Sequence, residues 1–410
     1  MADSLVITRQ QALLPRPQPG YPRVMSAFRF EPIDLPPVCA ELRGAVRAFI
    51  AEELDAGHWV PDSDFLVHRS AAFSRRLGAR GWIGMTWPET YGGHGRTMLE
   101  RYVVTEELLA AGAPVGAHWI ADRQSAPLIL RFGTQAQRHE FLPGIARGEI
   151  YFCIGMSEPD SGSDLAAVRT RAVPVEGGWE VSGTKVWTSY AHESHFAITL
   201  VRTTPATEDR HQGLSQLILD LHAPGVTIRP IINLAGDHDF NEIVLDRVFV
   251  PAERLVGQEG EGWHQVTSEL AFERSGPERF LSAYQILVAL IHQAGPDSGE
   301  NWGGPRAAEA IGSLAAQLWT LRRMSLSIAG MLQAGEMPNL EAALVKDLGN
   351  AFERAIPELA RLVAPGRRRA GTERLEEVLA AAVLHAPSWT LRGGTREILR
   401  GIIARGLGLR

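Results

Sequence analysis

The sequence has very little cysteine, no long apolar run and no large excess of either charge. Only Cys39 and Cys153 occur among 410 residues, which excludes a disulfide scaffold and a cysteine-ligated zinc or iron–sulfur site. The longest apolar stretches, such as Phe280 to Ile291, fall short of the ~20 residues that a membrane-spanning helix needs. The 41 Lys and Arg residues against 47 Asp and Glu give a net charge of −6, which excludes a general electrostatic attraction to nucleic acid or to anionic membranes.

Several familiar motifs are also missing. No G-x-S-x-G and no P-loop occur. The glycine-rich run 257–262 lies between an expected strand and an expected helix, so it does not predict a Rossmann fold. His192 and His195 form a close pair without a third ligand in register, and we therefore expect no metal site. No apolar signal core follows Met1, and four prolines between Pro15 and Pro22 oppose a transit helix, so we expect a soluble, cytoplasmic protein.

The spacing of apolar residues changes twice along the chain, and these changes predict the domain boundaries. Residues 36–147 have helical spacing of apolar side chains, residues 151–251 alternate as strands do, and helical spacing returns after Gly262. We predict a mostly helical α+β fold. Its expected parts are a flexible tail over 1–30, an N-terminal helical domain over 31–150, a middle antiparallel β domain over 151–255 and a C-terminal four-helix bundle over 256–410.

Individual elements follow from the same patterns. Gly177-Gly178 between two β-like runs predicts a hairpin. Loops are expected over 295–305 and at Pro365 to Arg369. Expected apolar helix faces comprise Val38, Leu42, Val46, Phe49 and Ile50; Val104, Leu108 and Leu109; Ile311, Leu314, Leu318, Leu321, Ile328 and Met331; and Leu340, Leu344, Leu348, Phe352, Ile356 and Leu359, the last face bending near Pro357.

Three segments have compositions that suit ligand binding. The run from Met156 to Asp164 places hydroxyl side chains and a glycine after an apolar strand, an arrangement that suits a phosphate or a flavin edge but also an ordinary Ser or Asx turn. Glu273-Arg274 lies in an apolar helix, where a desolvated carboxylate could act as a base, although such pairs are common on solvated helix faces. Gly393-Gly394-Thr395 allows close backbone approach and could cap a final helix, or form a simple inter-helix turn.

In this order the segments resemble those of the acyl-CoA dehydrogenase family, over nearly the whole chain from Pro36 to Leu409. Four stretches carry the resemblance, and they are Ser157-Glu158-Pro159 with Gly162-Ser163-Asp164, Gly183 to Ser189, Val248 to Pro251 followed by Gly257, and Gly394-Thr395 with Glu397-Ile398. The resemblance implies an FAD-dependent enzyme of lipid metabolism that oxidises an acyl-CoA to the trans-2-enoyl-CoA. A carboxylate takes the α-proton and flavin N5 takes the β-hydride.

The resemblance also implies roles for single residues. Cofactor contacts would come from Met156, Ser157, Trp187, Ser189, Thr395 and Glu397. Ser163 would line the pantetheine channel, and Arg274 would lie near the substrate.

The catalytic base is expected at Glu273. Most of the family carries its glutamate at the position of Gly393, which cannot take a proton. A minority, the isovaleryl- and long-chain-type enzymes, carries it before an arginine on the first bundle helix, and Glu273-Arg274 is similar to that arrangement. Gly393 would keep a share in holding the thioester carbonyl through its backbone N–H. Glu278 lies about 140° further round an ideal helix, so it is expected to point elsewhere unless Gly276-Pro277 bends the helix.

Two departures from the family pattern bear on the cofactor and the partners. The usual Arg-x-Phe-Gly segment is missing from 292–305, and Ala380 to Leu384 replaces the usual Gln and Gly-Gly, so the FAD pyrophosphate must be held differently. Expected partners are an acyl-CoA, an electron-transfer flavoprotein or similar acceptor, and further subunits in a homodimer, a homotetramer or a heteromer of two unlike chains. A flavin acyl-CoA oxidase and a non-catalytic partner subunit remain the alternatives.

The acyl group is only hinted at by the sequence. His118-Trp119 and Arg123-Gln124 fall in the region that lines the acyl pocket in relatives. Their size and polarity favour an acyl group other than a plain fatty chain, whereas the same residues could equally face the domain surface.

Overall fold

The computed structural model describes residues 28–64, 66–205, 208–294, 304–363 and 373–409, and for residues 269–273 it describes the helical backbone. The tail over 1–27, most of the two expected loops and the side chains of Leu270, Phe272 and Glu273 therefore lie outside the described part. Among the described helices, none combines the length and the apolarity that a membrane crossing requires.

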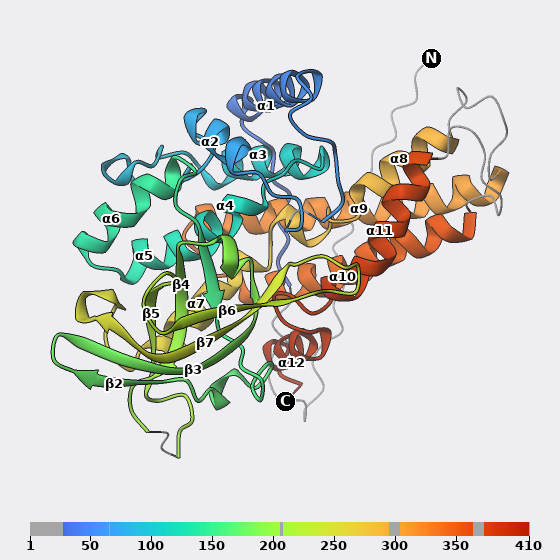
Figure 1. Cartoon of the computed structure of the whole chain (residues 1–410). Helices are drawn as coiled ribbons and strands as arrows, with labels where there is room; N and C mark the ends of the chain where they lie inside the picture. The colour runs from blue at the N-terminus through green and yellow to red at the C-terminus, as the bar shows by residue number, and fades with distance from the viewer. Residues whose placement is uncertain (1–27, 65, 206–207, 295–303, 364–372, 410) are drawn as a thin grey trace, which may run out of the picture.

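Helices form the first part of the fold, at the top and left of Figure 1. They are α1 (Pro37–Asp55), α2 (Ala71–Ala79), α3 (Met98–Ala110), α4 (Gly116–Ile120), α5 (Ala126–Phe132) and α6 (Gln135–Ala146). Capping boxes at Thr97 with Glu100 and at Thr134 with Gln137 fix the starts of α3 and α6. A single π turn, Ala121–Ser125, joins α4 to α5.

An eight-stranded sheet follows. Its strands are β1 (Phe152–Gly155), β2 (Arg171–Val175), β3 (Gly178–Ser189), β4 (Phe196–Arg202), β5 (Leu214–Asp220), β6 (Val226–Ile231), β7 (Phe240–Pro251) and β8 (Leu255–Val256). The order is β6-β7-β3-β2-β4-β5-β8, with β1 beside β4. The expected hairpin is confirmed, because β2 and β3 pair antiparallel around Gly177. Most strand pairs are antiparallel, as expected of the middle domain, while β4 pairs parallel with both β1 and β2.

The C-terminal region is again helical, and its helices α8 to α11 extend to the right of Figure 1. It contains α7 (Gly262–Glu273), a short 3-10 turn (Pro277–Arg279), α8 (Tyr284–Ala294), α9 (Gly304–Gln333), α10 (Asn339–Val363), α11 (Glu373–Trp389) and α12 (Arg396–Gly406). The predicted class, helices then a β domain then helices, is confirmed.

Helix α10 differs from its expected pattern. The predicted apolar face included Leu348, which is 41% exposed. The helix instead buries Lys346, Asn350 and Glu353 along with Phe352. Val38 in α1 is likewise exposed, while the rest of its predicted face is buried. Buried charged groups are stable only when partners compensate them, so the charged side chains on the buried face of α10 must have partners in the neighbouring elements.

Candidate active site

An open cleft of about 190 Å³ brings distant parts of the chain together. Its walls come from the N-terminal helices, from β1 and β3, and from two loops of the C-terminal region. The lining residues are Leu66, Trp119, Ile120, Gln124, Ile154, Trp187, Ser189, Arg279 and Arg392. Two of the predicted cofactor residues, Trp187 and Ser189, are therefore adjacent on one wall.

An irregularity in β3 presents Trp187 to this cleft. The pairing of β3 with β7 shifts register between Lys185 and Thr188, and Trp187 adopts a positive φ of 58°. A bulge of this kind turns a side chain away from the regular sheet face. The indole is 60% exposed, and Phe240 is its edge-to-face neighbour at 6.0 Å between ring centroids.

The loop after β1 is fixed to β3 beneath the cleft. The N–H of Val186 donates to the carbonyl oxygen of Ser157 at 2.9 Å, and the Lys185 ammonium donates to the carbonyl of Met156 at 3.1 Å and to Glu158 at 2.8 Å. Burial lowers the pKa of Lys185 to about 8 even though Glu158 opposes the shift. Burial acts to raise the pKa of Glu158, but Lys185 and neighbouring N–H groups lower it overall.

The same contacts hold the backbones of Met156 and Ser157 against Lys185 and Val186, directly before Trp187 in β3. Ser163, in contrast, is exposed on the outer part of this loop.

The segment 393–398, called the C-terminal signature below, begins with a tight turn before α12. Gly393 and Gly394 have φ of 69° and 98°, a region that glycine enters without strain. Thr395 occupies the N-cap position, as expected, but its side chain makes no capping hydrogen bond to the helix. Glu397 is exposed, and its own backbone N–H, together with Thr395, lowers its pKa.

The segment after α7 meets this turn. Helix α7 ends at Glu273, and the Nε–H of buried Arg274 donates to the carbonyl oxygen of Gly393 at 3.0 Å. The backbone of Glu273 is therefore tied, through its neighbour, to the glycine turn that precedes α12.

Glu278 was expected to point away from Glu273 unless Gly276-Pro277 bends the helix. Helix α7 does stop before Gly276-Pro277, and Glu278 sits in the following 3-10 turn. Its carboxylate is buried and lies 3.1 Å from a guanidinium nitrogen of Arg123. The ion pair with Arg123 thus explains why Glu278 is buried.

A buried charged network under the C-terminal signature had no signal in the sequence. Arg392 donates to Asp64 at 2.8 Å, and the indole N–H of Trp389 donates to the same carboxylate at 2.6 Å. Burial acts to raise the pKa of Asp64, but Arg392 and Trp389 lower it overall. Glu353 accepts from the N–H of Ser282 at 2.9 Å, and burial raises its pKa.

The N-terminal helices contribute to the cleft two of the four residues that the sequence suggested for the acyl pocket. Trp119 and Gln124 line the cleft. Arg123 stacks over Trp119, with 4.6 Å from its Cζ to the ring centroid, and burial lowers its pKa to about 10. His118 is buried away from the cleft against the Ser74 hydroxyl at 2.8 Å, and burial lowers its pKa to about 4.

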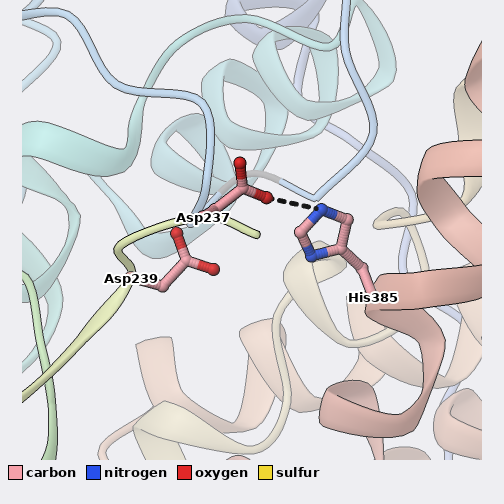
Figure 2. A group of neighbouring side chains, drawn as sticks. All are labelled: Asp237, Asp239 and His385. Atoms are coloured by element: carbon pink, nitrogen blue, oxygen red, sulfur yellow. Dashed lines mark ion pairs between the residues drawn. The ribbon is translucent and has the colours of Figure 1, made fainter. Parts of the chain in front are cut away.

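A separate group of side chains joins the β6–β7 loop to α11 (Figure 2). His385 Nε2 lies 3.3 Å from Asp237 Oδ2. Asp239 is buried and accepts hydrogen bonds from the Tyr190 hydroxyl at 2.9 Å and from the Asn233 amide. Because protein groups already occupy these carboxylates, the group serves as a contact between the sheet and the C-terminal helices.

The cleft fits the flavin that the resemblance implies. The indole of Trp187 is open to the cleft, and its face suits a planar aromatic ring. Ser189 supplies a hydroxyl beside it. These residues would hold the isoalloxazine of FAD, with the glycine turn at 393–394 open to close approach from the C-terminal side.

Comparisons with known proteins agree with this geometry. The family model "Acyl-CoA dehydrogenase, N-terminal domain" matches residues 38–149, and "Acyl-CoA dehydrogenase, middle domain" matches residues 153–248. Acyl-CoA dehydrogenase FadE29 of Mycobacterium tuberculosis is 30% identical over 91% of this chain and 97% of its own length. Acyl-CoA dehydrogenase FadE34 of the same organism is 33% identical over 81% of this chain, and acyl-CoA dehydrogenase IpdE1 is 37% identical over 57%. The chain spans only 45% of the length of FadE34 and 62% of that IpdE1.

Solved structures give the same result. The structure titled "Tcur3481-Tcur3483 steroid ACAD" is 27% identical with a TM-score of 0.79, over 92% of this chain and 99% of that one. The ChsE4-ChsE5 complex from Mycobacterium tuberculosis is 29% identical with a TM-score of 0.73, over 92% and 99%. The chain therefore belongs to the acyl-CoA dehydrogenase family, whose cofactor is FAD.

Proposed function

We propose that this chain catalyses the α,β-dehydrogenation of an acyl-CoA thioester, with Glu273 removing the α-proton. The observation that carries the proposal is the cleft in which the exposed indole of Trp187 and the half-buried Ser189 line the same space as Arg279 and Arg392. When bound there, FAD would supply the hydride acceptor for the β-hydrogen. The remaining steps belong to side chains and backbone groups of the chain.

Glu273 is the proposed base because of its neighbour. Arg274 is buried and bonded to the carbonyl of Gly393, so the end of α7 runs alongside the C-terminal signature. Gly393 has no carboxylate to offer, and Glu278 is already paired with Arg123. A base needs reach, orientation and a suitable pKa rather than a fixed place in the sequence.

Backbone groups of the glycine turn would hold the thioester carbonyl. The turn at Gly393 and Gly394 has left-handed backbone geometry, which directs N–H groups differently from a helix. In other enzymes, one such donor aimed at the developing negative charge lowers the activation free energy by roughly 3 kcal/mol. Ser163 and Arg274 are proposed to contact the pantetheine and the acyl end, respectively.

The decisive experiment is an anaerobic titration of the purified holoenzyme with a panel of acyl-CoA thioesters, read through the flavin absorption. Bleaching is expected with at least one member. The panel includes steroid-derived acyl groups, because the relative titled "steroid ACAD" is 27% identical, and (2S)-methylsuccinyl-CoA, because a dehydrogenase of that name from Cereibacter sphaeroides is 30% identical over 81% of this chain.

The base assignment is tested by Glu273→Gln, with Glu176→Gln in the exposed β2–β3 turn as the control. The first variant should keep its yellow colour, but its rate of flavin bleaching should fall about 10²-fold or more. The control should bleach at the rate of the parent. Full turnover by Glu273→Gln would remove Glu273 from the mechanism. Peroxide formation in air without an added acceptor would select the oxidase instead of a dehydrogenase that passes electrons to an electron-transfer flavoprotein.

We further propose that the chain functions beside a second acyl-CoA dehydrogenase-like subunit. Two of the similar structures are titled as pairs of differently named chains. Large apolar side chains are exposed around the C-terminal signature, at Leu348, Leu391 and Ile398, as expected of a surface that a partner covers.

Native mass spectrometry of the chain expressed alone should then show little FAD, and co-expression with the partner should raise the flavin content. Full flavin loading in a homodimer or homotetramer would contradict this proposal.

A further inference from the structure

The end of β3 has an unusual backbone at two positions. Trp187 has a φ of 58° and Tyr190 has a φ of 52°, a left-handed region that a residue other than glycine keeps only when its surroundings hold it there. Thr188 and Ser189 lie between them, and Ser189 lines the cleft together with Trp187. The contacts that fix this four-residue segment therefore also fix one wall of the cleft.

The start of β7 holds this segment. Asp239 accepts hydrogen bonds from the backbone N–H of Tyr190 and from the Tyr190 hydroxyl, each at 2.9 Å. Thr188 pairs with Asn241 in the ladder between β3 and β7, and the register shifts immediately before this pair. Because Trp187 lies within the shift, the contacts made by Thr188 are the ones that anchor its side of the segment.

Asn241 makes a side-chain contact with Thr188. Its side chain is fully buried, and its Nδ2 donates to the carbonyl oxygen of Thr188 at 3.1 Å. That carbonyl lies between Trp187 and Ser189, the two residues of β3 that line the cleft. A hydrogen bond that fixes its direction therefore restrains the backbone of both.

Two histidines fix the orientation of the Asn241 amide. His192 Nδ1 lies 3.1 Å and His238 Nε2 lies 2.7 Å from Asn241 Oδ1. Because Nδ2 faces the carbonyl of Thr188, Oδ1 faces the two rings, and both ring nitrogens must carry a hydrogen and donate. The rings stack with 3.7 Å between their centroids and 13° between their planes, so each restricts the movement of the other.

We propose that Asn241, held by His192 and His238, is a positioning residue that fixes the β3 bulge from which Trp187 contacts the flavin ring. This rests on the proposed function and deepens it by naming the residues that shape the flavin wall. Asn241 is fully buried and acts through the backbone at Thr188. A wall that is fixed before binding spares the cofactor the free energy of ordering it.

The test is the dissociation constant of FAD, measured by flavin fluorescence on dilution of the holoenzyme. Asn241→Asp keeps the size of the side chain and the oxygen that faces the histidines, but it removes the donor to Thr188. FAD binding should weaken about 10-fold, as expected for one hydrogen bond near the upper end of its usual strength. Unchanged FAD binding by folded Asn241→Asp would overturn the inference.

A double-mutant cycle with Trp187→Ala shows whether Asn241 acts through the indole. In the Trp187→Ala background, Asn241→Asp should weaken FAD binding by less than about 2-fold further, because the side chain that it positions is already gone. Two independent losses, which together would reach about 100-fold, would rule out positioning of the indole.

A matched control separates positioning from a general loss of stability. Gln137 is 2% exposed, and its Nε2 donates to the carbonyl oxygens of Glu253 and Leu255 at 2.7 and 2.9 Å. Gln137→Glu should lower the thermal unfolding midpoint and leave FAD binding within about 2-fold of the parent. Equal weakening of FAD binding by Gln137→Glu and Asn241→Asp would contradict a positioning role.

The histidines supply a second test that stands even if Asn241→Asp fails to fold. His192→Phe combined with His238→Phe removes both donors to Asn241 Oδ1 and keeps two rings that can stack, and it should weaken FAD binding as Asn241→Asp does. Each single variant leaves one donor and should change binding by less than about 3-fold. Parent-like FAD binding by the folded double variant would also overturn the inference.

The outcomes separate this inference from the proposed function. Flavin bleaching in the parent together with an additive cycle overturns the positioning role and leaves dehydrogenation standing. A coupled cycle without bleaching by any acyl-CoA supports the role of Asn241 and contradicts the dehydrogenase. Failure of the parent to bind FAD, both alone and with a co-expressed second subunit, overturns both.

Discussion

Replacing Asp64 by asparagine should destabilise the protein strongly, because it breaks a buried ion pair without removing its cation. Asp64 accepts from Arg392 at 2.8 Å and from Trp389 at 2.6 Å, and all three side chains are largely buried. Asparagine keeps the shape and tolerates the positive φ of 61° at this position. What it loses is the charge opposite Arg392, and removal of one partner from a buried pair typically costs about 3–5 kcal/mol.

The assay is urea unfolding followed by circular dichroism, with Asp246→Asn as the matched control because that carboxylate is 78% exposed. The control should stay within about 0.5 kcal/mol of the parent. If Asp64→Asn also loses less than about 1 kcal/mol, the network under the C-terminal signature contributes little to stability.

The pH dependence of the difference gives a second check. The fold lowers the pKa of Asp64, so its contribution to the free energy of unfolding is present above the unfolded pKa of about 3.9 and is lost as pH falls through the folded pKa. The gap between the parent and Asp64→Asn should therefore shrink below about pH 4. A gap that widens on acidification would contradict this assignment.

Three further predictions concern the middle domain and its neighbour. Lys185→Met should lower the free energy of unfolding by about 3 kcal/mol because Glu158 then stays buried without its ammonium partner. Thermal unfolding measures the difference, and an unchanged midpoint would refute the prediction. Trp187→Ala should weaken FAD binding by about 10-fold or more, since it removes the exposed indole; flavin fluorescence on dilution measures it, and unchanged retention would rule out ring contact. Gly148→Ala should destabilise the N-terminal helices, because the residue has a φ of 69° and its methyl group would lie 2.4 Å from the carbonyl oxygen of Ser74, whereas Gly57→Ala, which meets nothing within 4 Å, should cost only its backbone strain.

The sequence predicted best what is encoded locally. The apolar face at Val104 and Leu108 is buried as expected, and the hairpin around Gly177 forms where turn residues separate two alternating runs. These features depend on spacing within one segment, which a single sequence displays. The same holds for the change from helices to strands and back.

The sequence failed where distant segments decide the outcome. The pairing of Asp64 with Arg392 spans 328 positions, and no local pattern marks either residue. Leu348 was assigned to a buried face because its spacing is helical, but it is exposed, although Phe352 and Ile356 of the same face are buried. Gly276-Pro277 signalled that α7 could end there, but nothing local marked the ion pair of Glu278 with Arg123, which lies 155 positions away.

The bulge in β3 has a consequence for how the protein matures in the cell. The left-handed backbone at Trp187 holds the indole outward, so a chain without bound flavin would expose this aromatic surface to solvent. A cofactor that covers it acts as a stabilising ligand in proportion to its free concentration. Riboflavin starvation during expression should then send newly made chains into aggregates rather than into a pool of apoprotein that awaits loading.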